Sequence, residues 1–373
     1  RFNQVLEKGA TQTYSKPALQ GGDIAFLQYT GGTTGVSKGA MLTHRNMVGN
    51  LEQVSGCLDS FLVKGGENVV TALPLYHIFA LTANFFTFFK YGGTNLLITN
   101  PRDMPGFVKE LSKFPFTAIT GVNTLFNGLL NTPGFAELNF STLKLSLGGG
   151  MAVQRPVAER WQKITGTRLV EGYGLTETSP VIAVNRYNEN NRRFGTVGTV
   201  INGVEVKIAE DGEICCKGDN VMMGYYKDEA KSAQTFRTFE GSRWSVPGDW
   251  AEILADGTLV LLGRGSVCIN TGGEKVFPEE VEEVLKRHSS VRDAVAVGIP
   301  DTRFGETICG VVEAEAGATP TLSVLNEHVK SALAAYKAPR HIVVIDTIGR
   351  APNGKVDYKR LKANAMKELG IET

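Results

Sequence analysis

The sequence predicts an α/β protein in which a large domain is followed by a small, mobile α+β C-terminal domain. The large domain would have a doubly wound, mainly parallel sheet and a β-rich region. Three observations lead to this prediction. Short apolar runs alternate with helical patterns over the first 170 residues, β-type runs dominate after about residue 195, and a new α+β pattern starts near residue 266. Strands that alternate with helices favour a parallel sheet.

Six apolar runs predict the strands of the first region, and helical apolar spacing predicts the segments between them. The predicted strands are 25–29, 68–72, 95–99, 117–121, 143–147 and 168–170, and the predicted helices are 44–62, 105–113 and 153–165. Ligands of parallel α/β sheets bind beyond the carboxyl ends of the strands. Unusual loops follow Tyr29, Ala72, Leu147 and Val170, so we expect these four loops to form one site.

Later segments predict the β-rich region and the C-terminal domain. Runs at 205–208, 213–217 and 258–262 are strand-like, and a helix is predicted from Pro278, because Pro favours the first helical position and Glu residues precede Lys286 and Arg287. Strands at 294–297, 310–314 and 341–345 and a helix at 322–335 follow. We therefore divide the chain into a large domain, 1–263, and a C-terminal domain, 264–373. Within the large domain, residues 1–195 form the α/β region and residues 196–263 the β-rich region.

Composition argues against several classes of protein. Lysine plus arginine total 39 against 38 aspartate plus glutamate, a balance that is unusual for a dedicated nucleic-acid binder. Five cysteines without a CxxC pair predict neither a disulfide framework nor a structural zinc site, and indicate a reducing compartment. The stretch 69–89 lacks charged residues, but Pro74, His77 and Asn84 interrupt it. We interpret it as a buried strand, a loop and a helix rather than a membrane span.

The clearest chemical signal is the glycine- and threonine-rich segment after Tyr29. Residues 30–35 read TGGTTG, and Lys38 follows. Backbone N–H groups, hydroxyls and a lysine together suit a polyphosphate. The spacing differs from that of the Walker P-loop, and a flexible turn is the alternative interpretation.

A second signal is the segment EGYGLTET, which starts at Glu171. Tyr173 offers a flat face to a base, Thr176 offers a hydroxyl, and Glu177 offers a hard carboxylate oxygen of the kind that Mg²⁺ accepts. The alternative is a capped helix start in which Thr176 and Glu177 serve the first turn.

These segments, in this order, resemble the acyl-adenylate-forming superfamily and, within it, the long-chain fatty-acid–CoA ligases. The motifs that carry the resemblance are TGGTTGVSKG, ALPLYHIFAL, LSLGGGM, EGYGLTETSP, VPGDW, LLGRGSVCINTGGEKVFPEEVE, YKAPR and NGKVDYKRL. Residues 20–185 are most similar to bacterial long-chain ligases, whereas 245–285 are similar to a branch with mycobacterial and steroid-degradation ligases. Family members have a long further segment before the Thr/Gly loop, so we expect this chain to be N-terminally incomplete.

The resemblance implies a role for each site residue. The catalytic residues would be Lys355, Thr176, Glu177 and His77, with Lys355 as the mobile catalytic lysine and Glu177 as the Mg²⁺ ligand. The ATP and AMP contacts would be Thr30, Gly31, Gly32, Thr33, Thr34, Gly35, Lys38, Gly148, Gly149, Gly150, Glu171, Gly172, Tyr173, Gly174, Asp249 and Arg264, and the CoA contacts would be Gly272, Gly273 and Glu274. Within this set, Tyr173 would stack on adenine and Asp249 would accept hydrogen bonds from the ribose.

The residues by themselves leave other interpretations open. His77 could equally be a core histidine, Asp249 an ordinary turn residue, and Arg264 and Lys355 surface charges. The aromatic residues Phe85, Phe86, Phe88 and Phe89 could line a fatty-acyl tunnel, although core packing is the more common use of such spacing.

The resemblance implies ATP-dependent activation of a medium- or long-chain fatty acid through an acyl-AMP and transfer to CoA. ATP, Mg²⁺ and CoA would be required, nucleic acid would not bind, and the location would be cytoplasmic. Oligomeric state and weak peripheral membrane contact stay open. The alternatives are a steroid- or aryl-acid–CoA ligase, an acyl-AMP ligase that loads a carrier protein, and an inactive nucleotide-binding fragment.

Four positions depart from the family pattern. Pro247 stands where threonine is usual before Gly-Asp, and Ser266 stands at a hinge position where Asp or Lys is common. Several members also have lysines at the positions of Asn270 and Gly272. We therefore expect domain rotation and nucleotide contacts to be tuned differently in this chain.

Overall fold

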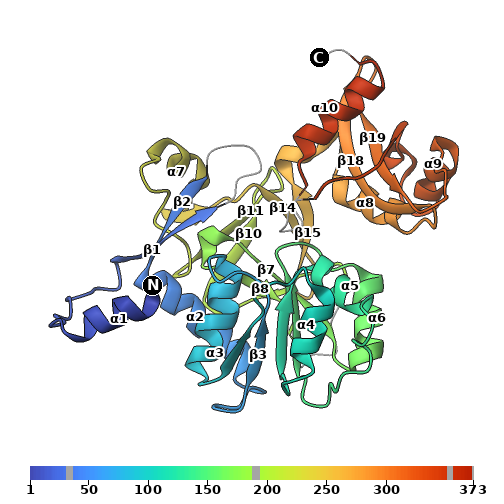
Figure 1. Ribbon diagram of the computed structural model, residues 1–373. Coiled ribbons are helices and arrows are strands. Elements are labelled where there is room, and N and C mark those ends of the chain that lie inside the picture. Colours follow the sequence, from blue (N-terminus) through green and yellow to red (C-terminus); the bar gives the residue numbers. More distant parts are fainter. Residues whose placement is uncertain (31–36, 187–193, 351–355, 372–373) are drawn as a thin grey trace.

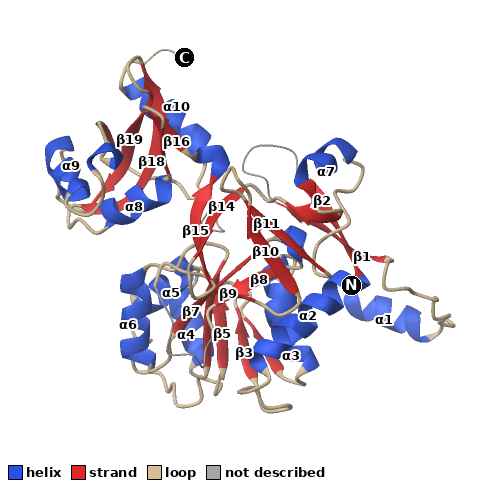
Figure 2. Ribbon diagram, turned by 180° about the vertical axis from the view of Figure 1, so that it is seen from behind, coloured by secondary structure: helices blue, strands red, loops and turns tan. Residues whose placement is uncertain are grey.

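The computed structural model describes residues 1–30, 37–186, 194–350 and 356–371 (Figure 1). The predicted α/β class is confirmed, since a large sheet is covered by helices and a smaller α+β unit follows it in the chain. In Figures 1 and 2, the C-terminal unit lies beyond the ends of strands β14 (Asp249–Ile253) and β15 (Thr258–Arg264).

The central sheet is mixed rather than mainly parallel over its whole width. Its other strands are β3 (Asn68–Thr71), β4 (Thr94–Leu97), β5 (Ala118–Gly121), β6 (Leu145–Gly149), β7 (Leu169–Gly174), β8 (Val181–Val184) and β9 (Gly198–Val200). In the described residues the order is β14-β15-β9-β8-β7-β6-β5-β3-β4. The strands from β7 to β4 are parallel, and those from β7 to β14 pair antiparallel. The direction reverses after β7 because the link to β8 is too short for a parallel crossover.

Helices cover both faces of the parallel strands, which confirms the doubly wound prediction (Figure 2). Neighbouring side chains of one strand point to opposite faces. Val70 packs in the cluster with residues of α4 (Met104–Leu111), α5 (Asn123–Leu130) and α6 (Arg155–Thr165). Val69 packs with residues of α2 (His44–Leu58) and α3 (Thr87–Lys90) on the other face. Both residues are fully buried, as expected for a strand between two helical layers.

The first predicted strand lies outside this sheet, so that element of the prediction is wrong. Strand β1 (Ile24–Thr30) pairs antiparallel with β2 (Lys38–Thr43) in a separate two-stranded sheet. A parallel neighbour would need a crossover of a dozen or more residues, and only residues 31–37 separate β1 from β2. Helix α1 (Phe2–Ala10) precedes the hairpin and is exposed along its length.

The uncharged stretch 69–89 folds as predicted into β3, a loop and helical turns, namely the π-helix η1 (Ala80–Phe86) and α3. The buried amide of Asn84 anchors these turns to the sheet. Its Nδ2 donates to the carbonyl oxygen of Val70 at 3.2 Å and to Thr71 Oγ1 at 3.0 Å, and its Oδ1 accepts from Thr120 at 2.7 Å. Among the described helices, none combines the length and the apolar character needed to cross a membrane.

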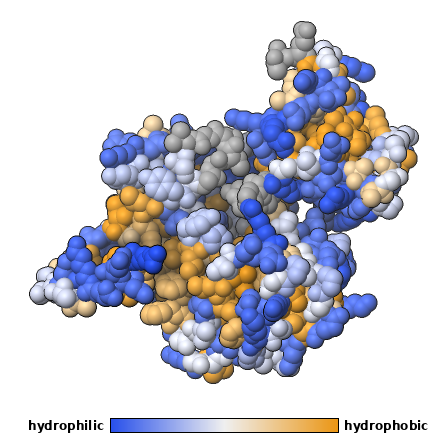
Figure 3. Space-filling view, in the orientation of Figure 1, coloured by the Kyte–Doolittle hydropathy of each residue, from blue (hydrophilic) through white to orange (hydrophobic). Residues whose placement is uncertain are grey.

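The phenylalanines of this stretch divide between core and surface. Phe88 is 1% exposed and belongs to the core, whereas Phe89 is 73% exposed and stacks on Phe85, with ring centroids 6.0 Å apart. Core packing therefore does not describe Phe85 and Phe89. Figure 3 shows further apolar surface at the N-terminal side of the molecule, beside α1.

The β-rich region contains a four-stranded antiparallel sheet beside the central one. Its strands are β10 (Val204–Ile208), β11 (Ile214–Gly218), β12 (Phe236–Phe239) and β13 (Ser242–Ser245), with α7 (Glu229–Thr235) before β12. Ile214 and Cys216 of β11 pack in one cluster with Tyr173 of β7. The β-rich region therefore shares a core with the end of the parallel strands.

The C-terminal unit has its own sheet and two apolar clusters. Its strands are β16 (Ile269–Thr271), β17 (Glu274–Val276), β18 (Val291–Asp301), β19 (Gly305–Ala314) and β20 (His341–Ile345), and its helices are α8 (Pro278–Lys286), α9 (Leu322–Lys330) and α10 (Tyr358–Glu368). Helices α8 and α9 pack on one face of the β18–β19 hairpin, and α10 packs on the other. The apolar residues of both clusters lie between 269 and 371.

Trp161 of α6 provides a test of the large core. The side chain is fully buried, its Nε1 donates to Ser146 Oγ at 3.0 Å, and its ring lies 4.8 Å from that of Phe126. We expect Trp161→Ala to lower the free energy of unfolding by roughly 3–5 kcal/mol, because it leaves a large cavity. Urea unfolding measures this, with Tyr14→Ala as control because Tyr14 is 80% exposed. Equal effects of the two substitutions would contradict the packing described for α6.

Candidate active site

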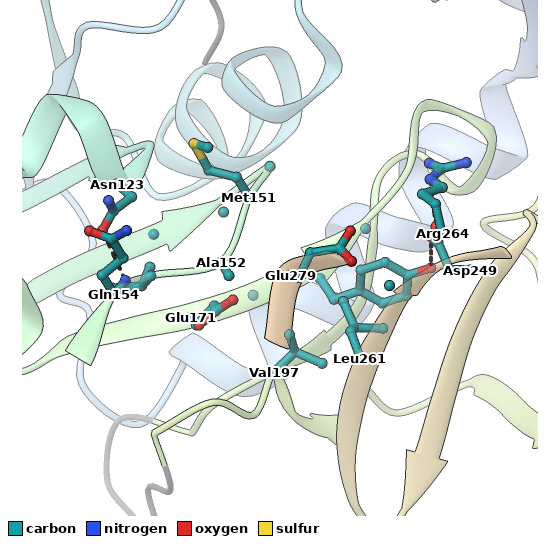
Figure 4. Close-up of a pocket in the computed structure, with 18 of the residues that line it drawn as sticks. Asn123, Met151, Ala152, Gln154, Glu171, Val197, Asp249, Leu261, Arg264 and Glu279 are labelled. Atoms are coloured by element: carbon teal, nitrogen blue, oxygen red, sulfur yellow. Dashed lines mark hydrogen bonds and ion pairs between the residues drawn. The ribbon is translucent and has the colours of Figure 1, made fainter. Parts of the chain in front are cut away.

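An open cleft of about 1970 Å³ lies between the carboxyl edge of the central sheet and the C-terminal unit. Figure 4 shows part of its wall, with Glu171 of β7 and Glu279 of α8 facing the same space. Residues from all four of the predicted rim loops contribute to it, as do segments 347–350 and 356–358 of the C-terminal unit. In the residues that the structure describes, the four loops therefore line one cleft.

Glycines at the ends of β6 and β7 form a flat backbone floor. An added Cβ would lie 2.3 Å from a methyl group of Val153 at Gly148, and 3.2 Å from the ring of Phe79 at Gly149. Gly150 has a φ angle of 77°, a backbone conformation that residues with a side chain rarely adopt. Gly149 pairs with Gly172 of β7 across the parallel ladder. Val153 and Phe79 therefore pack directly against the backbone at Gly148 and Gly149, and neither position has room for a side chain.

Glu171 is partly buried, and its carboxyl group lies in the wall of the cleft. Burial raises its pKa to about 8, the negative charge of Glu283 adds to this rise, and a hydrogen bond from the backbone N–H of Val153 opposes it. At neutral pH the group is therefore mainly protonated and can donate a hydrogen bond.

Tyr173, Asp249 and Arg264 meet on one wall, as Figure 4 shows for the labelled Asp249 and Arg264. Tyr173 donates its hydroxyl to Asp249 Oδ2 at 2.5 Å, and Arg264 Nε lies 2.6 Å from Asp249 Oδ1. The β14–β15 ladder places Asp249 directly opposite Arg264. Burial raises the pKa of Asp249, and the Arg264 charge and the Tyr173 hydroxyl oppose that rise. Asp249 is thus a buried, paired carboxylate and not an ordinary turn residue.

Pro247 takes part in the same arrangement. Its carbonyl oxygen accepts a hydrogen bond from Arg264 Nη1 at 3.1 Å. Any residue at this position has this backbone acceptor, so the contact does not depend on proline; together with the ion pair to Asp249 it shows that Arg264 is not a free surface charge.

Thr176 and Glu177 lie in a short 3-10 turn, η2 (Thr176–Thr178), and both line the cleft. The alternative of a capped α-helix start is wrong, because the chain continues directly into β8. Glu177 Oε1 accepts a hydrogen bond from the Tyr225 hydroxyl at 2.6 Å. Tyr225 therefore occupies one side of Oε1. Because Glu177 also lines the cleft, its carboxylate can still offer an oxygen to a cation there.

Thr30 and Lys38 close the β1–β2 hairpin as directly paired residues and both line the cleft. His77 also lines it; its ring is exposed, and its Nδ1 accepts from the N–H of Phe79 at 3.2 Å. The core-histidine alternative is therefore wrong. Six predicted site residues lie outside the described residues: Gly31, Gly32, Thr33, Thr34, Gly35 and Lys355.

The three predicted CoA contacts do not join the others in this arrangement. Gly272, Gly273 and Glu274 are exposed at the turn between β16 and β17, and none of them is among the described residues that line the cleft. The N–H of Gly272 donates to the carbonyl oxygen of Phe304 at 2.8 Å. The C-terminal residues that line the cleft instead include Ile348, Gly349, Arg350, Val356 and Tyr358.

The sequence patterns do not predict the contact that joins the C-terminal unit to β14 and β15. The ring centroids of Trp250 and Phe277 lie 5.5 Å apart, and Lys275 Nζ lies 3.9 Å from the centroid of the Trp250 ring. Glu279 Oε2 is buried there without a hydrogen-bond partner, and an added Cβ at Gly263 would lie 2.5 Å from it. Burial and the charge of Glu282 raise the pKa of Glu279 to about 7. No local pattern signals such a contact, because it joins distant segments.

Tyr225, whose hydroxyl binds Glu177, is like Glu279 a residue of this region that the sequence motifs do not include.

Within the described part of the chain, no three or more His, Cys, Asp or Glu residues form a group that could hold a metal ion. Glu177 is thus the one metal ligand that the motifs indicate.

Family models match both ends of the chain. The model described as AMP-binding enzyme matches residues 2–226, and the model described as AMP-binding enzyme C-terminal domain matches residues 280–355.

Named relatives agree with these matches. A long-chain-fatty-acid–CoA ligase of Escherichia coli O6:H1 is 45% identical over 98% of this chain, which spans 66% of that relative's length. A medium/long-chain-fatty-acid–CoA/3-oxocholest-4-en-26-oate–CoA ligase of Mycolicibacterium smegmatis is 34% identical over 97% of this chain and 70% of its own length. The crystal structure of ATP-bound MatB from Rhodopseudomonas palustris superimposes with a TM-score of 0.85 at 26% identity, covering 99% of this chain and 73% of that one.

The buried carboxyl group of Glu279 predicts a pH-dependent contact between the large domain and the C-terminal unit. Its pKa is about 7 when docked and about 4.3 when solvated, so docking takes up a proton. Docking is therefore unopposed below about pH 4.3, weakens as the pH rises from there through about 7, and levels off above that pH. Acrylamide quenching of tryptophan fluorescence should increase between pH 6 and 8, because Trp250 becomes exposed.

Glu279→Gln should remove this pH dependence, because the amide stays neutral. The other two tryptophans, Trp161 and Trp244, are at most 8% exposed and should not contribute. Glu283→Gln, one turn further along α8 at a side chain that is 52% exposed, is the matched control. The same pH profile in Glu279→Gln as in the unsubstituted chain would contradict the docking role.

Proposed function

Because this chain belongs to the AMP-binding enzyme family, we propose that it activates a medium- or long-chain fatty acid with ATP and transfers the acyl group to CoA. The two family matches confirm the family that the sequence motifs predict. The observation that carries the proposal is the gathering of Thr30, Lys38, Glu177 and Asp249, from separate segments, around one cleft. The name of the Escherichia coli relative supports the choice of fatty acid and CoA.

The nucleotide would lie across the sheet edge. Tyr173 would present its ring to adenine above the glycine floor, and Glu171, neutral at pH 7, would donate a hydrogen bond to the base. The ribose hydroxyls would donate to Asp249, whose oxygens keep free lone pairs beside Tyr173 and Arg264. Lys38 would face the phosphates, where a cation is stabilising.

In the first half-reaction, an oxygen of the fatty acid carboxylate attacks the α-phosphorus of ATP. A new O–P bond forms, the bond to the β-phosphate oxygen breaks, and pyrophosphate leaves with the electron pair. The residues act by holding the reacting oxygen in line and by stabilising negative charge on the phosphates. We assign these tasks to Thr176 and Lys38 and, from the family resemblance, to Lys355, with His77 beside the carboxylate.

A magnesium ion fits the donor set beside the phosphates. Mg²⁺ is commonly held by one or two carboxylates together with phosphate oxygens and water, and Glu177 is a carboxylate that lines the cleft next to Thr176. When bound, the ion would neutralise phosphate charge. Glu177 would hold it, and Tyr225 would keep Glu177 in place.

In the second half-reaction, the CoA sulfur attacks the acyl carbon and AMP leaves with the bonding electron pair. Gly272, Gly273 and Glu274 would approach the cleft only if the C-terminal unit turned about the segment after Arg264. We propose that the chain divides there, into domains 1–263 and 264–373. The apolar clusters support this division, since their members lie either between 26 and 261 or between 269 and 371.

Pyrophosphate release tests the proposed reaction. We expect this chain, given ATP, Mg²⁺, CoA and palmitate, to form AMP, pyrophosphate and palmitoyl-CoA in equal amounts. A panel of short, medium and long acids with a cholestenoic acid distinguishes fatty from steroid substrates, a choice raised by the Mycolicibacterium smegmatis relative's name. ATP binding without acid-dependent pyrophosphate release would instead support an inactive nucleotide-binding fragment.

Lys355 is expected to act in the first half-reaction only. Lys355→Ala should slow pyrophosphate release by about 10²–10³-fold, because a charge-stabilising donor is lost. Transfer of the acyl group from preformed acyl-AMP to CoA should stay within about twofold. The exposed Lys359 supplies the control, Lys359→Ala, and equal losses in both half-reactions would contradict the assigned role.

A further inference from the structure

The carboxylate of Glu177 is held by Tyr225, which lies outside both the TGGTTGVSKG motif and the EGYGLTETSP motif. Tyr225 donates its hydroxyl to Glu177 Oε1 at 2.6 Å, across 48 positions of sequence. Its ring is 8% exposed and packs with Ala40, Leu42 and Met47. The hydroxyl is thus fixed by a rigid ring on one side and by the Glu177 carboxylate on the other.

The segment that carries Tyr225 binds Glu177 a second time. The backbone N–H of Met222 donates to the carbonyl oxygen of Glu177 at 2.9 Å. Glu177 is therefore held through both its backbone and its side chain. Ser232 Oγ in turn accepts from the N–H of Tyr225 at 2.8 Å, which limits how far this segment can shift.

The same segment is also bound to β2, the strand that begins with Lys38. The N–H of Met41 donates to the carbonyl oxygen of Gly224 at 2.9 Å, and the N–H of Tyr226 donates to that of Gly39 at 2.8 Å. Ala40 forms an antiparallel bridge with Tyr225. Tyr225 therefore connects the strand of the proposed phosphate-binding lysine to the proposed metal-binding carboxylate.

We propose that Tyr225 is a positioning residue for the Mg²⁺ complex of ATP, which orients the Glu177 carboxylate relative to Lys38. This inference rests on the proposed function and deepens it. A phenol donates one hydrogen bond, and donation to Oε1 turns the carboxylate so that its other oxygen is the one available to a cation. Groups that orient a metal ligand in this way affect metal affinity strongly, although they never touch the ion.

Tyr225→Phe tests the proposal, since it removes the hydroxyl and keeps the buried ring. The measurement is the dissociation constant of ATP, by isothermal titration calorimetry on the whole chain, once with EDTA and once with saturating Mg²⁺. We expect Tyr225→Phe to bind Mg²⁺-free ATP within about twofold of the unsubstituted chain. The gain in affinity on adding Mg²⁺ should shrink by roughly tenfold.

The neighbouring residue provides the matched control. Tyr226 is 41% exposed, and its ring lies 5.2 Å from Lys227 Nζ. Tyr226→Phe therefore removes the same atom from the same segment and should leave both dissociation constants unchanged. Thermal unfolding of both variants verifies that they are folded.

A double-mutant cycle shows whether Tyr225 acts through Glu177. In a Glu177→Gln background, adding Tyr225→Phe should change the Mg²⁺ gain by less than about twofold, because the group that Tyr225 orients is already lost. Additive losses would overturn the proposal, as would an unchanged Mg²⁺ gain in Tyr225→Phe alone. Equal weakening of ATP binding with and without Mg²⁺ would also overturn it, since that result indicates a general packing role.

Failure of the proposed function has a different signature. ATP binding with a normal Mg²⁺ gain but without acid-dependent pyrophosphate release would contradict the ligase reaction and would still leave the Tyr225 comparison decisive. Absence of ATP binding by the unsubstituted chain would overturn both.

Discussion

The buried carboxylate of Asp249 is the interaction on which the arrangement of this molecule depends. It joins Tyr173, at the end of the parallel strands, to Arg264, at the end of β15 and the start of the link to the C-terminal unit. A buried charge that loses its partner is strongly destabilising, so Arg264 cannot easily move away from Asp249. The point from which the C-terminal unit departs is therefore fixed to the wall of the cleft that Tyr173, Asp249 and Arg264 form.

The parallel half of the sheet was predictable from sequence. Each of its strands is a short apolar run, and a long connecting segment leads from one run to the next. Strands β3, β5, β6 and β7 lie within a few residues of their predicted positions. The same rule failed for β1, since an apolar run resembles a parallel strand until its partner is known. The partner is β2, which begins soon after the glycine-rich loop. A short separation between two strand-forming segments favours such a hairpin over a parallel crossover.

The residues of the site also fall into two groups: some belong to short sequence motifs, and others acquire a role only through contact with a distant segment. Glycines, Thr176 and Glu177 belong to compact motifs, so their chemistry could be inferred from neighbouring residues. Tyr225 and Glu279 could not be inferred, because each acquires its role only through packing against a remote segment. For Glu279 the helical signal was correct, as a carboxylate in the first turn of α8 favours the macrodipole. Its burial against Gly263 depends on how the C-terminal unit sits on β15, which no helix pattern contains.

The raised pKa values in the cleft have a common cause and a common consequence. Burial raises the pKa of Glu171, Asp249 and Glu279 alike, but Asp249 has a cationic partner, Arg264, at 2.6 Å. Glu171 and Glu279 can therefore be neutral near pH 7, whereas Asp249 can stay ionised. The proposed ATP site would benefit from this division, since each additional carboxylate charge in the cleft would repel phosphate. The charge that Asp249 retains lies where the ribose would offer hydroxyl donors, and the neutral groups spare the phosphates further repulsion.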